Sequence, residues 1–362
     1  MKKENLSILR CPVTREVLTL KVIESAIVSY SNKDEKIISQ GILTGKSGWI
    51  YPVIDGIPRM IVEAFLDYDV FFAKHLKDYS QKKMYLLQEY GDLVKYIVTK
   101  NKRTKESFKQ EWNLYNYEED KTWDEAPEGM LKRFFIETDE SVTSIKGKII
   151  FDAGCGNGLL DSLIANCGAT VVAMDFSESI IPAFKRNKQE NAFFIQGDVQ
   201  FPPVAFQYFD IVHCSGVLIH TNNPELSFSK LVPCIKPIGK FSVWLYHPRE
   251  NLIHNTFNKV RRVTSKLPLK LQFYLYSLTL LPMSFIVKKL KGNKQNPREM
   301  MIDLLDWLSP EFRWELTHEE VTAWYMKYGF HSIKVTTTNL FGFNIIGVKD
   351  SQPLANTTGR QL

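Results

Sequence analysis

Three glycines alternate with other residues in the stretch Gly154-Cys155-Gly156-Asn157-Gly158, which follows the apolar run 149–151 and Asp152. Glycine adopts backbone conformations closed to other residues and lets a ligand lie against the main chain, and the free N–H groups of a following helix attract anions. The stretch is therefore typical of a nucleotide-type binding loop. Because glycine also punctuates ordinary turns, the loop alone does not decide the function.

The next apolar run, 169–174, ends in Asp175. A carboxylate at the tip of the second strand of a doubly wound sheet can accept hydrogen bonds from both hydroxyl groups of a ribose. A nicotinamide-binding loop requires Gly-x-Gly-x-x-Gly/Ala, but Leu159 stands at the position of the third small residue. A nicotinamide-dependent oxidoreductase is therefore the weaker alternative.

The acid and the glycines of this loop resemble the first motif of the class I S-adenosylmethionine-dependent methyltransferases. The resemblance continues in chain order with Asp175, the turn 197–199, the strand-like run 209–214 and the segment 216–221. It covers roughly residues 127–250 and 315–350. One departure is Ile238, which stands in a turn where the family often has a second glycine.

This resemblance implies the cofactor S-adenosylmethionine and the product S-adenosylhomocysteine. It implies that Asp175 binds the ribose and that Asp198 binds the adenine amino group. It also implies that Asp152 lies near the ammonium group of the cofactor's methionine part. The implied cofactor-binding residues are Asp152, Gly154, Cys155, Gly156, Gly158, Asp175, Phe176, Asp198, Val199 and Cys214. For Cys214 a place in the apolar core is an equal alternative.

Three histidines, His213, His220 and His247, lie near the ends of the expected fourth strand, 209–214, and fifth strand, 240–246, where open sheets bind their ligands. A sulfonium methyl group is already activated, so a methyltransferase mainly has to align the acceptor and, for a hydroxyl acceptor, remove a proton. His220 and His247 are the candidate catalytic bases, with His220 the better placed. A structural role is the alternative for each histidine.

Strand-like and helix-like segments alternate from Pro127 onward, which requires a parallel sheet with helices on both faces. A capping box at 317–320 opens a helix that ends at Gly329, and the runs 333–337 and 344–348 pair as a hairpin. The expected fold class is α/β, with a Rossmann-like, seven-stranded, mostly parallel sheet and a C-terminal antiparallel hairpin. A small β-rich N-terminal module and a helical insertion complete it.

Residues 1–63 form the N-terminal module, whose runs 9–14 and 51–58 resemble the zinc-ribbon-like domain that activates certain RNA and protein methyltransferases. Metal-binding members hold zinc with two Cys-x-x-Cys pairs. The corresponding positions here are Cys11, Thr14, Thr44 and Ser47. One thiolate is too few for tetrahedral zinc, so we expect no metal. Docking of a substrate or partner and a structural relic are the two alternatives for its role.

The rest of the chain divides into a connector, 64–126, a methyltransferase domain, 127–350, and a flexible tail, 351–362. Apolar and aromatic residues recur at helical spacing up to about residue 101 and predict a connecting helical pair. The segment 108–112 resembles segments that help to cover the cofactor in related methyltransferases. Ordinary packing of Trp112 is the alternative.

The insertion at 251–298 holds ten Lys or Arg residues and no Asp or Glu, and its stretch 271–287 carries no charge. Pro282 interrupts this stretch, which is short for a membrane span. A helical lid over the substrate site is the expected form, and its uncharged stretch must then be buried. An amphipathic surface on an anionic membrane is the alternative.

The 362 residues suggest a main domain with additions, and five cysteines without a disulfide framework favour a cytoplasmic protein. We expect an S-adenosylmethionine-dependent methyltransferase that acts on an oxygen or nitrogen of a small-molecule or biosynthetic acceptor. The alternatives are an inactive cofactor-binding partner subunit and a methyltransferase of a lipid-linked or RNA substrate. The chain shows no stacking-aromatic and basic motif for nucleic acid.

Overall fold

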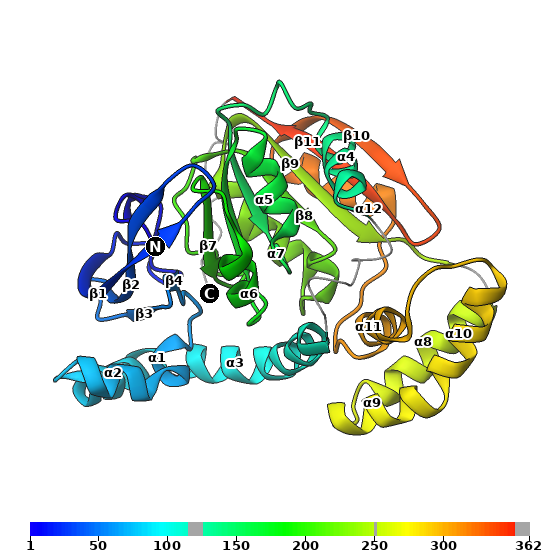
Figure 1. Cartoon of the computed structure of the whole chain (residues 1–362), viewed down its shortest axis with the longest axis horizontal. Coiled ribbons are helices and arrows are strands. Elements are labelled where there is room, and N and C mark those ends of the chain that lie inside the picture. The colour runs from blue at the N-terminus through cyan, green and yellow to red at the C-terminus, as the bar shows by residue number, and fades with distance from the viewer. Residues whose placement is uncertain (115–125, 250–251, 352–362) are drawn as a thin grey trace.

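A computed structural model describes the backbone of residues 1–114, 126–249 and 252–351, with their side chains except at residues 104, 106–114, 252 and 253. Within this part of the chain, seven strands form the main sheet in the spatial order β10-β11-β9-β8-β5-β6-β7 (Figure 1). They are β5 (Ile149–Ala153), β6 (Thr170–Asp175), β7 (Ala192–Gln196), β8 (Phe209–Ser215), β9 (Ile235–Tyr246), β10 (Phe330–Thr338) and β11 (Gly342–Lys349).

The strands β5 to β9 are parallel, whereas β11 runs antiparallel to both β9 and β10. From β5 the chain adds strands first on one side and then, with β8, on the other. Open sheets bind ligands at the carboxyl ends of the strands beside such a reversal. The expected α/β class, with its parallel sheet and C-terminal hairpin, is confirmed.

Helices cover both faces of this sheet; they are α4 (Pro127–Thr138), α5 (Leu159–Asn166), α6 (Ile180–Arg186), α7 (Pro224–Leu231) and α12 (His318–Lys327). On one face, Phe134 of α4 and Ile164 of α5 belong to the same buried apolar cluster. On the other face, Phe228 of α7 and Tyr325 of α12 are buried in a larger cluster. The sheet is therefore the middle layer of three.

The capping box expected at 317–320 is present. The backbone N–H of Glu320 donates to Thr317 Oγ1 at 3.2 Å, and the N–H of Thr317 donates to the Glu320 carboxylate at 2.7 Å. These two bonds satisfy donors that the first turn of α12 leaves without helical partners. The start of α12 is thus encoded locally in the sequence.

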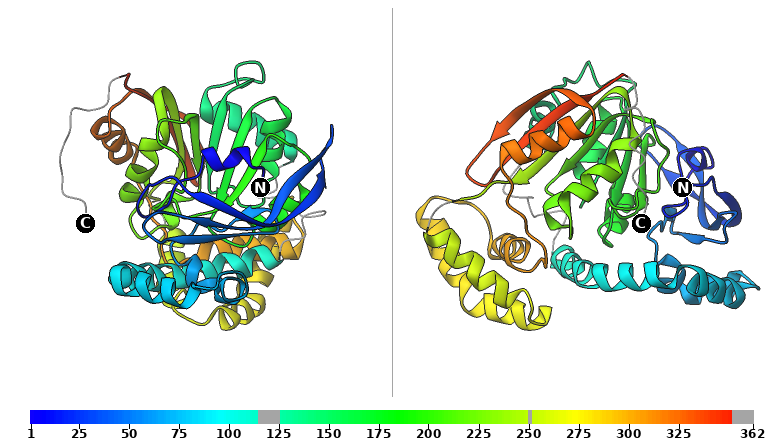
Figure 2. Two further views of the ribbon diagram at one scale, coloured as in Figure 1. Left: turned by 90° about the vertical axis from the view of Figure 1, so that its left-hand side faces the viewer. Right: turned by 180° about the vertical axis from the view of Figure 1, so that it is seen from behind.

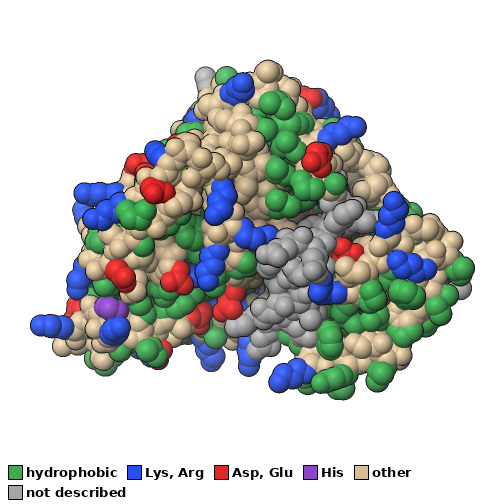
Figure 3. Space-filling view, in the orientation of Figure 1, with side chains coloured by type: hydrophobic (Ala, Val, Ile, Leu, Met, Phe, Trp, Pro, Cys, Tyr) green, Lys and Arg blue, Asp and Glu red, His purple; other side chains and the backbone are tan. Residues whose placement is uncertain are grey.

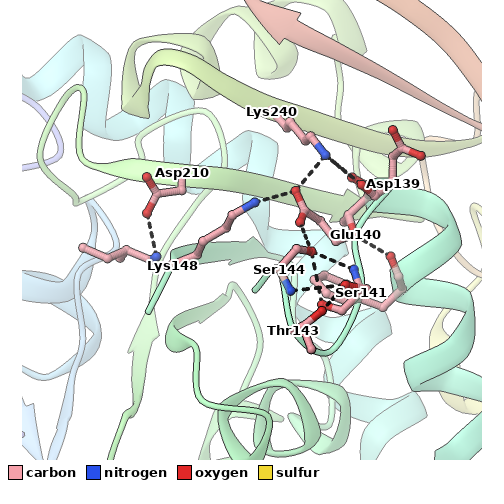
Figure 4. A network of polar contacts seen from close by, with 11 residues as sticks. Asp139, Glu140, Ser141, Thr143, Ser144, Lys148, Asp210 and Lys240 are labelled. Atoms are coloured by element: carbon pink, nitrogen blue, oxygen red, sulfur yellow. Dashed lines mark hydrogen bonds and ion pairs between the residues drawn. The ribbon is translucent and has the colours of Figure 1, made fainter. Parts of the chain in front are cut away.

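Glu140, in the turn between α4 and β5, is the centre of a polar network on the side of the sheet where the parallel strands begin (Figure 4). Its carboxylate accepts hydrogen bonds from Lys148 at 2.6 Å and from Lys240 at 2.7 Å. Burial would raise the pKa of Glu140, but these bonds hold that pKa below its ordinary value. This side of the sheet is occupied by a structural network, which leaves the carboxyl ends of the strands for a ligand.

The N-terminal module is a four-stranded antiparallel sheet of β1 (Thr19–Ser29), β2 (Asp34–Thr44), β3 (Ile50–Ile54) and β4 (Ile57–Pro58), preceded by the 3-10 turn η1 (Glu4–Ser7). It lies beside the β7 edge of the main sheet (Figures 1 and 2). The backbone N–H of Met60 donates to Gln196 O at 2.7 Å, and that of Arg10 donates to Pro203 O at 2.9 Å. The module is therefore joined to the main domain by backbone hydrogen bonds.

The Glu16 carboxylate connects two of the four positions compared above with zinc ligands, Thr14 and Ser47. The hydroxyl groups of Thr14 and Ser47 donate to Glu16 Oε1 at 2.9 and 2.6 Å. The Cys11 thiol lies 3.3 Å from the Tyr51 hydroxyl and is buried. No set of three or more His, Cys, Asp or Glu side chains is placed to hold a metal in the described chain. Both the zinc-ribbon likeness and the absence of metal stay predictions.

Three helices connect the module to the rest of the chain: α1 (Ala64–Asp67), α2 (Asp69–His75) and α3 (Tyr79–Leu114). The expected helical pair is thus two short helices and one long one, whose regular backbone is interrupted at Tyr90. In Figures 1 and 2, α3 extends from the N-terminal module toward the insertion. The predicted cover by 108–112 lies outside the described side chains.

The insertion folds into α8 (Leu252–Thr264), α9 (Leu269–Leu278) and α10 (Leu280–Leu290), followed by α11 (Pro297–Leu308). Tyr276 of α9 packs with Met301 and Leu305 of α11 in a small separate core. No helix in the described chain is long and apolar enough to cross a membrane.

The burial expected of a lid is wrong for most of the uncharged stretch. Leu278 is 79% exposed and Met283 is 65% exposed, and no residue of α10 is fully buried. Sequence composition could not show this, because an uncharged apolar helix is compatible with a core, a lid or an exposed surface.

Candidate functional site

The glycine loop turns directly from β5 into α5. Its glycines at 154, 156 and 158 have φ angles of 114°, 52° and 69°, all in the region that favours glycine. Gly154 is also in close contact with the loop after β8, because a Cβ atom there would collide with the Val217 side chain. The loop therefore needs glycine for its backbone and for its packing.

Asp175, at the carboxyl end of β6, is fixed against this loop. One carboxylate oxygen accepts from the Gly156 N–H at 2.9 Å, and the other accepts from the Ser177 N–H at 2.8 Å and from its hydroxyl at 2.6 Å. Burial raises the pKa of Asp175, and the bonds from Ser177 and Gly156 oppose that rise. Asp175 and the neighbouring Phe176 remain partly accessible. The structure thus brings together the glycine loop and the carboxylate expected to bind a ribose.

Asp198, after β7, is more deeply placed than its expected role suggested. The ammonium group of Lys100, from α3, lies 3.2 Å from Asp198 Oδ2, and Asn101 Nδ2 lies 3.3 Å from the same oxygen. Both Asp198 and Val199 are only 7% exposed. The turn is therefore close to the site but is covered by α3, whose Lys100 competes for the carboxylate assigned to adenine.

Asp152 belongs to a buried network between the sheet and the helices α4 and α5. Its Oδ1 lies 2.9 Å from His213 Nδ1, and the other ring nitrogen of His213 lies 3.0 Å from Glu137 Oε2. Burial raises the pKa of Asp161 in α5, and the nearby Asp152 carboxylate raises it further. His213 is thus a buried partner of acids, and its place does not suit a base for an acceptor. The Asp152 carboxylate, expected near the ammonium group of the cofactor, likewise already contacts His213.

The two cysteines assigned to the cofactor differ in position. Cys214 is completely buried, and its thiol donates to Ala153 O at 3.1 Å. It belongs to the apolar core, and its assignment to the cofactor does not fit this position. Cys155 is partly accessible in the glycine loop, and burial of its thiol raises its pKa well above the ordinary value. The backbone N–H of Cys155 donates to Met174 O at 3.0 Å.

His220 is buried next to the end of β9, in the 3-10 turn η3 (Leu218–His220). Its Nδ1 lies 3.0 Å from Phe312 O, and its Nε2 lies 3.9 Å from Asp306 Oδ1. Burial lowers the pKa of His220 to about 4 and raises that of Asp306 to about 6. The Tyr246 hydroxyl donates to Asp306 Oδ2 at 3.2 Å. These three residues form a polar cluster at the carboxyl ends of β8 and β9.

His247, the other candidate base, lies directly after β9 and is half-buried. Its Nε2 lies 3.1 Å from Asn339 O and 3.2 Å from Leu340 O, in the turn of the C-terminal hairpin. A ring nitrogen this close to two carbonyl oxygens carries the proton and donates it. The contact therefore favours a structural role for His247.

A hollow of about 450 Å³ lies between residues 92–100 of α3 and the residues Asn222 and Phe312. Phe312 also supplies the carbonyl oxygen that contacts His220. No motif in the sequence marks Lys100, Tyr246 or Asp306 as a site residue. Lys100 is one of many lysines in its helix, and Asp306 lies beyond the insertion. Each of them reaches the site only because of the way the chain folds.

Residues 151–243 match the methyltransferase domain family. The match spans the glycine loop, Asp175, Asp198 and His220, and the cofactor of such a domain is S-adenosylmethionine. A ubiquinone biosynthesis O-methyltransferase from Coxiella burnetii (strain RSA 493 / Nine Mile phase I) is 35% identical over 104 residues, which are 28% of this chain and 44% of that protein. This chain therefore contains a methyltransferase domain.

A demethylmenaquinone methyltransferase from Renibacterium salmoninarum is 30% identical over 144 residues, which are 40% of this chain and 58% of that protein. Among solved structures, magnesium protoporphyrin IX methyltransferase from Synechocystis PCC 6803 with bound SAH aligns with a TM-score of 0.41 at 16% identity, over 68% of this chain and 98% of that one. The chain thus spans about half the length of the two curated relatives.

Proposed function

We propose that this protein is a methyltransferase that transfers the methyl group of S-adenosylmethionine to an oxygen or nitrogen of a small-molecule acceptor. The observation that carries the proposal is the contact between the glycine loop and Asp175 at the reversal of strand order, within the stretch that matches a methyltransferase domain. Oxygen is favoured as the acceptor atom, because a relative that matches this stretch is an O-methyltransferase.

The residues of the site fit this cofactor. Asp175 is a partly accessible, fixed carboxylate, which can accept hydrogen bonds from ribose hydroxyls. The glycines at 154 and 156 expose backbone against which the methionine part can lie. Bound S-adenosylmethionine supplies an electrophilic methyl group, so that the protein has to orient the acceptor and take up its proton.

We assign the acceptor side of the site to the polar cluster of His220, Tyr246 and Asp306. This cluster adjoins the hollow beside α3 through Phe312. The pKa of Asp306, about 6, leaves its carboxylate mostly ionised at neutral pH. A carboxylate of that pKa can take the proton of a hydroxyl acceptor, and Tyr246 holds it in place.

Cofactor binding tests the first part of the proposal. We expect calorimetry to show micromolar binding of S-adenosylmethionine or S-adenosylhomocysteine and no comparable binding of NAD. Asp175→Ala should weaken that binding by about 1 to 3 kcal/mol, because ribose hydroxyls lose a charged acceptor. Glu225→Ala is the matched control, since Glu225 is a carboxylate that pairs with Lys327 at the surface. Tighter binding of NAD, or unchanged affinity in Asp175→Ala, contradicts the assignment.

The pH dependence of methyl transfer tests the acceptor side. With radiolabelled S-adenosylmethionine and a panel of small phenols as probes, we expect turnover to rise as the pH increases through about 6, where Asp306 loses its proton. Asp306→Asn should remove this rise and lower turnover about tenfold at pH 7, since an amide cannot accept the proton. If Asp306→Asn still shows the increase of turnover with pH, another group is responsible for that increase. The absence of turnover with intact cofactor binding would favour the inactive partner subunit.

A further inference from the structure

Two helices of the insertion turn apolar side chains to the solvent at helical spacing. In α9 these are residues 271, 274, 275 and 278, and in α10 they are residues 283, 286, 287 and 290. Each set follows the i, i+3, i+4, i+7 pattern of one helical face. We call these eight residues the apolar patch; they are Leu271, Tyr274, Leu275, Leu278, Met283, Ile286, Val287 and Leu290.

The residues of the apolar patch are strongly exposed for apolar side chains in water. Leu278 is 79% exposed and Leu290 is 83% exposed, whereas the opposite side of α9 packs Tyr276 against α11. In Figure 3 hydrophobic side chains gather over the end of the molecule that Figure 1 assigns to α8, α9 and α10. Exposed apolar side chains grouped on helical faces in this way mark an interaction site.

The charges of the segment that carries the apolar patch are all of one sign, although Lys288 pairs with Asp303 of α11. Residues 251–298 contain ten Lys or Arg and no Asp or Glu. Seven of these basic side chains are exposed, namely Lys259, Arg262, Lys266, Lys270, Lys289, Lys291 and Lys294. Helices with an exposed apolar face and basic flanks lie in the interface of anionic bilayers, where the apolar side chains enter the acyl boundary and the cations meet the headgroups.

We propose that the apolar patch and its basic flanks dock this protein on the surface of an anionic phospholipid bilayer. The charge pattern favours a bilayer over a second copy of the chain. If two copies met through this surface, their basic flanks would repel each other. A nucleic acid would leave the apolar side chains in water. Docking is peripheral, since no described helix can span a bilayer.

The docked surface is connected to the candidate site. Arg103 of α3 donates a hydrogen bond to Leu267 O, just before α9, at 3.0 Å, and Lys100 of the same helix contacts Asp198. Asp306 of α11, the helix beneath the apolar patch, contacts Tyr246. One helix, α11, therefore separates the docked surface from the acceptor side of the site.

Vesicle flotation with the full-length protein tests the proposal. The probes are phosphatidylcholine vesicles with and without 30% phosphatidylglycerol. We expect binding to the anionic vesicles to exceed binding to the neutral ones at least tenfold and to fall in high salt, because salt screens surface charge. Leu278→Glu with Leu290→Glu should lower binding to anionic vesicles at least tenfold. Val70→Glu, a charge at an equally exposed apolar position of α2, should leave it unchanged.

Two further measurements separate docking from its alternatives. S-adenosylmethionine binding and the circular dichroism of the Leu278→Glu, Leu290→Glu variant should match the parent, since both side chains lie on the surface. Equal binding to neutral and anionic vesicles, or an equal loss in Val70→Glu, overturns the proposal. A parent protein that ignores vesicles but forms an oligomer dissolved by the two substitutions would assign the apolar patch to a second copy of the chain.

Discussion

His213→Leu should lower the free energy of unfolding by about 3 to 5 kcal/mol. His213 lies between two buried carboxylates, Asp152 at 2.9 Å and Glu137 at 3.0 Å. Leucine fills a similar volume but leaves both acids without their cationic partner in a medium of low dielectric constant. Urea denaturation of the two proteins at pH 6.5 measures the difference. The expected loss is large because breaking a buried pair costs more than the pair itself contributes.

The effect of His213→Leu should depend on pH. Burial alone would lower the pKa of His213, but the charges of Asp152 and Glu137 raise it to about 10. The folded protein therefore retains a proton that the unfolded chain releases near its ordinary pKa of 6.5. The stabilisation is fully present below pH 6.5 and is lost as the pH rises toward 10, so the difference between parent and variant should shrink over that range.

His331→Leu is the matched control for this substitution. His331 also contacts a carboxylate, Asp350, at 2.7 Å, but this pair is at the surface. Exposed pairs contribute about 0 to 1 kcal/mol, so the control should be nearly neutral. A loss in His213→Leu no larger than that of the control would mean that the buried acids hold protons of their own.

Gly154→Ala should reduce the affinity for S-adenosylmethionine about 100-fold or more, which corresponds to roughly 3 kcal/mol. The φ angle of 114° is strained for alanine, and the added methyl group would collide with Val217. The loop must therefore shift away from Asp175, whose carboxylate accepts the Gly156 N–H. Calorimetric titration of the cofactor measures the change.

Two variants divide the effect of Gly154→Ala between strain and collision. Gly147 has a φ of 76° and open space at the Cβ position, so Gly147→Ala introduces backbone strain without collision, outside the site. It should leave cofactor affinity unchanged. Adding Val217→Ala to Gly154→Ala removes the colliding methyl group and should restore part of the affinity. Normal binding by Gly154→Ala alone would show that the cofactor does not use this loop.

The fold could be predicted from the sequence because its signals are local. Alternating strands and helices define the parallel sheet, and the side chains at 317 and 320 define the start of α12. Even the departure at Ile238 agrees with the structure, since its φ of 63° is a conformation that favours glycine. The strand β2 is harder to predict, because it starts with the charged residues 34–36, which obscure the alternation typical of strands.

The site was harder to predict because its polar contacts cross the fold. Asp175 follows from its position at the end of a strand, and the structure places it against the glycine loop. The burial of His213 between acids depends on α4, and that of Asp198 depends on Lys100 in α3. Neither helix has a sequence spacing relative to the loop that could reveal these contacts.

Helix α3 has a practical consequence for anyone who shortens this chain. A fragment that begins at Pro127 retains every strand of the main sheet but loses Lys100 and Asn101 from Asp198, and it loses Arg103 from the start of α9. It also loses the Met60 contact that covers the edge of β7, and an uncovered strand edge invites aggregation. The smallest sound unit for expression therefore includes the N-terminal module and α3, although the recognisable domain begins after both.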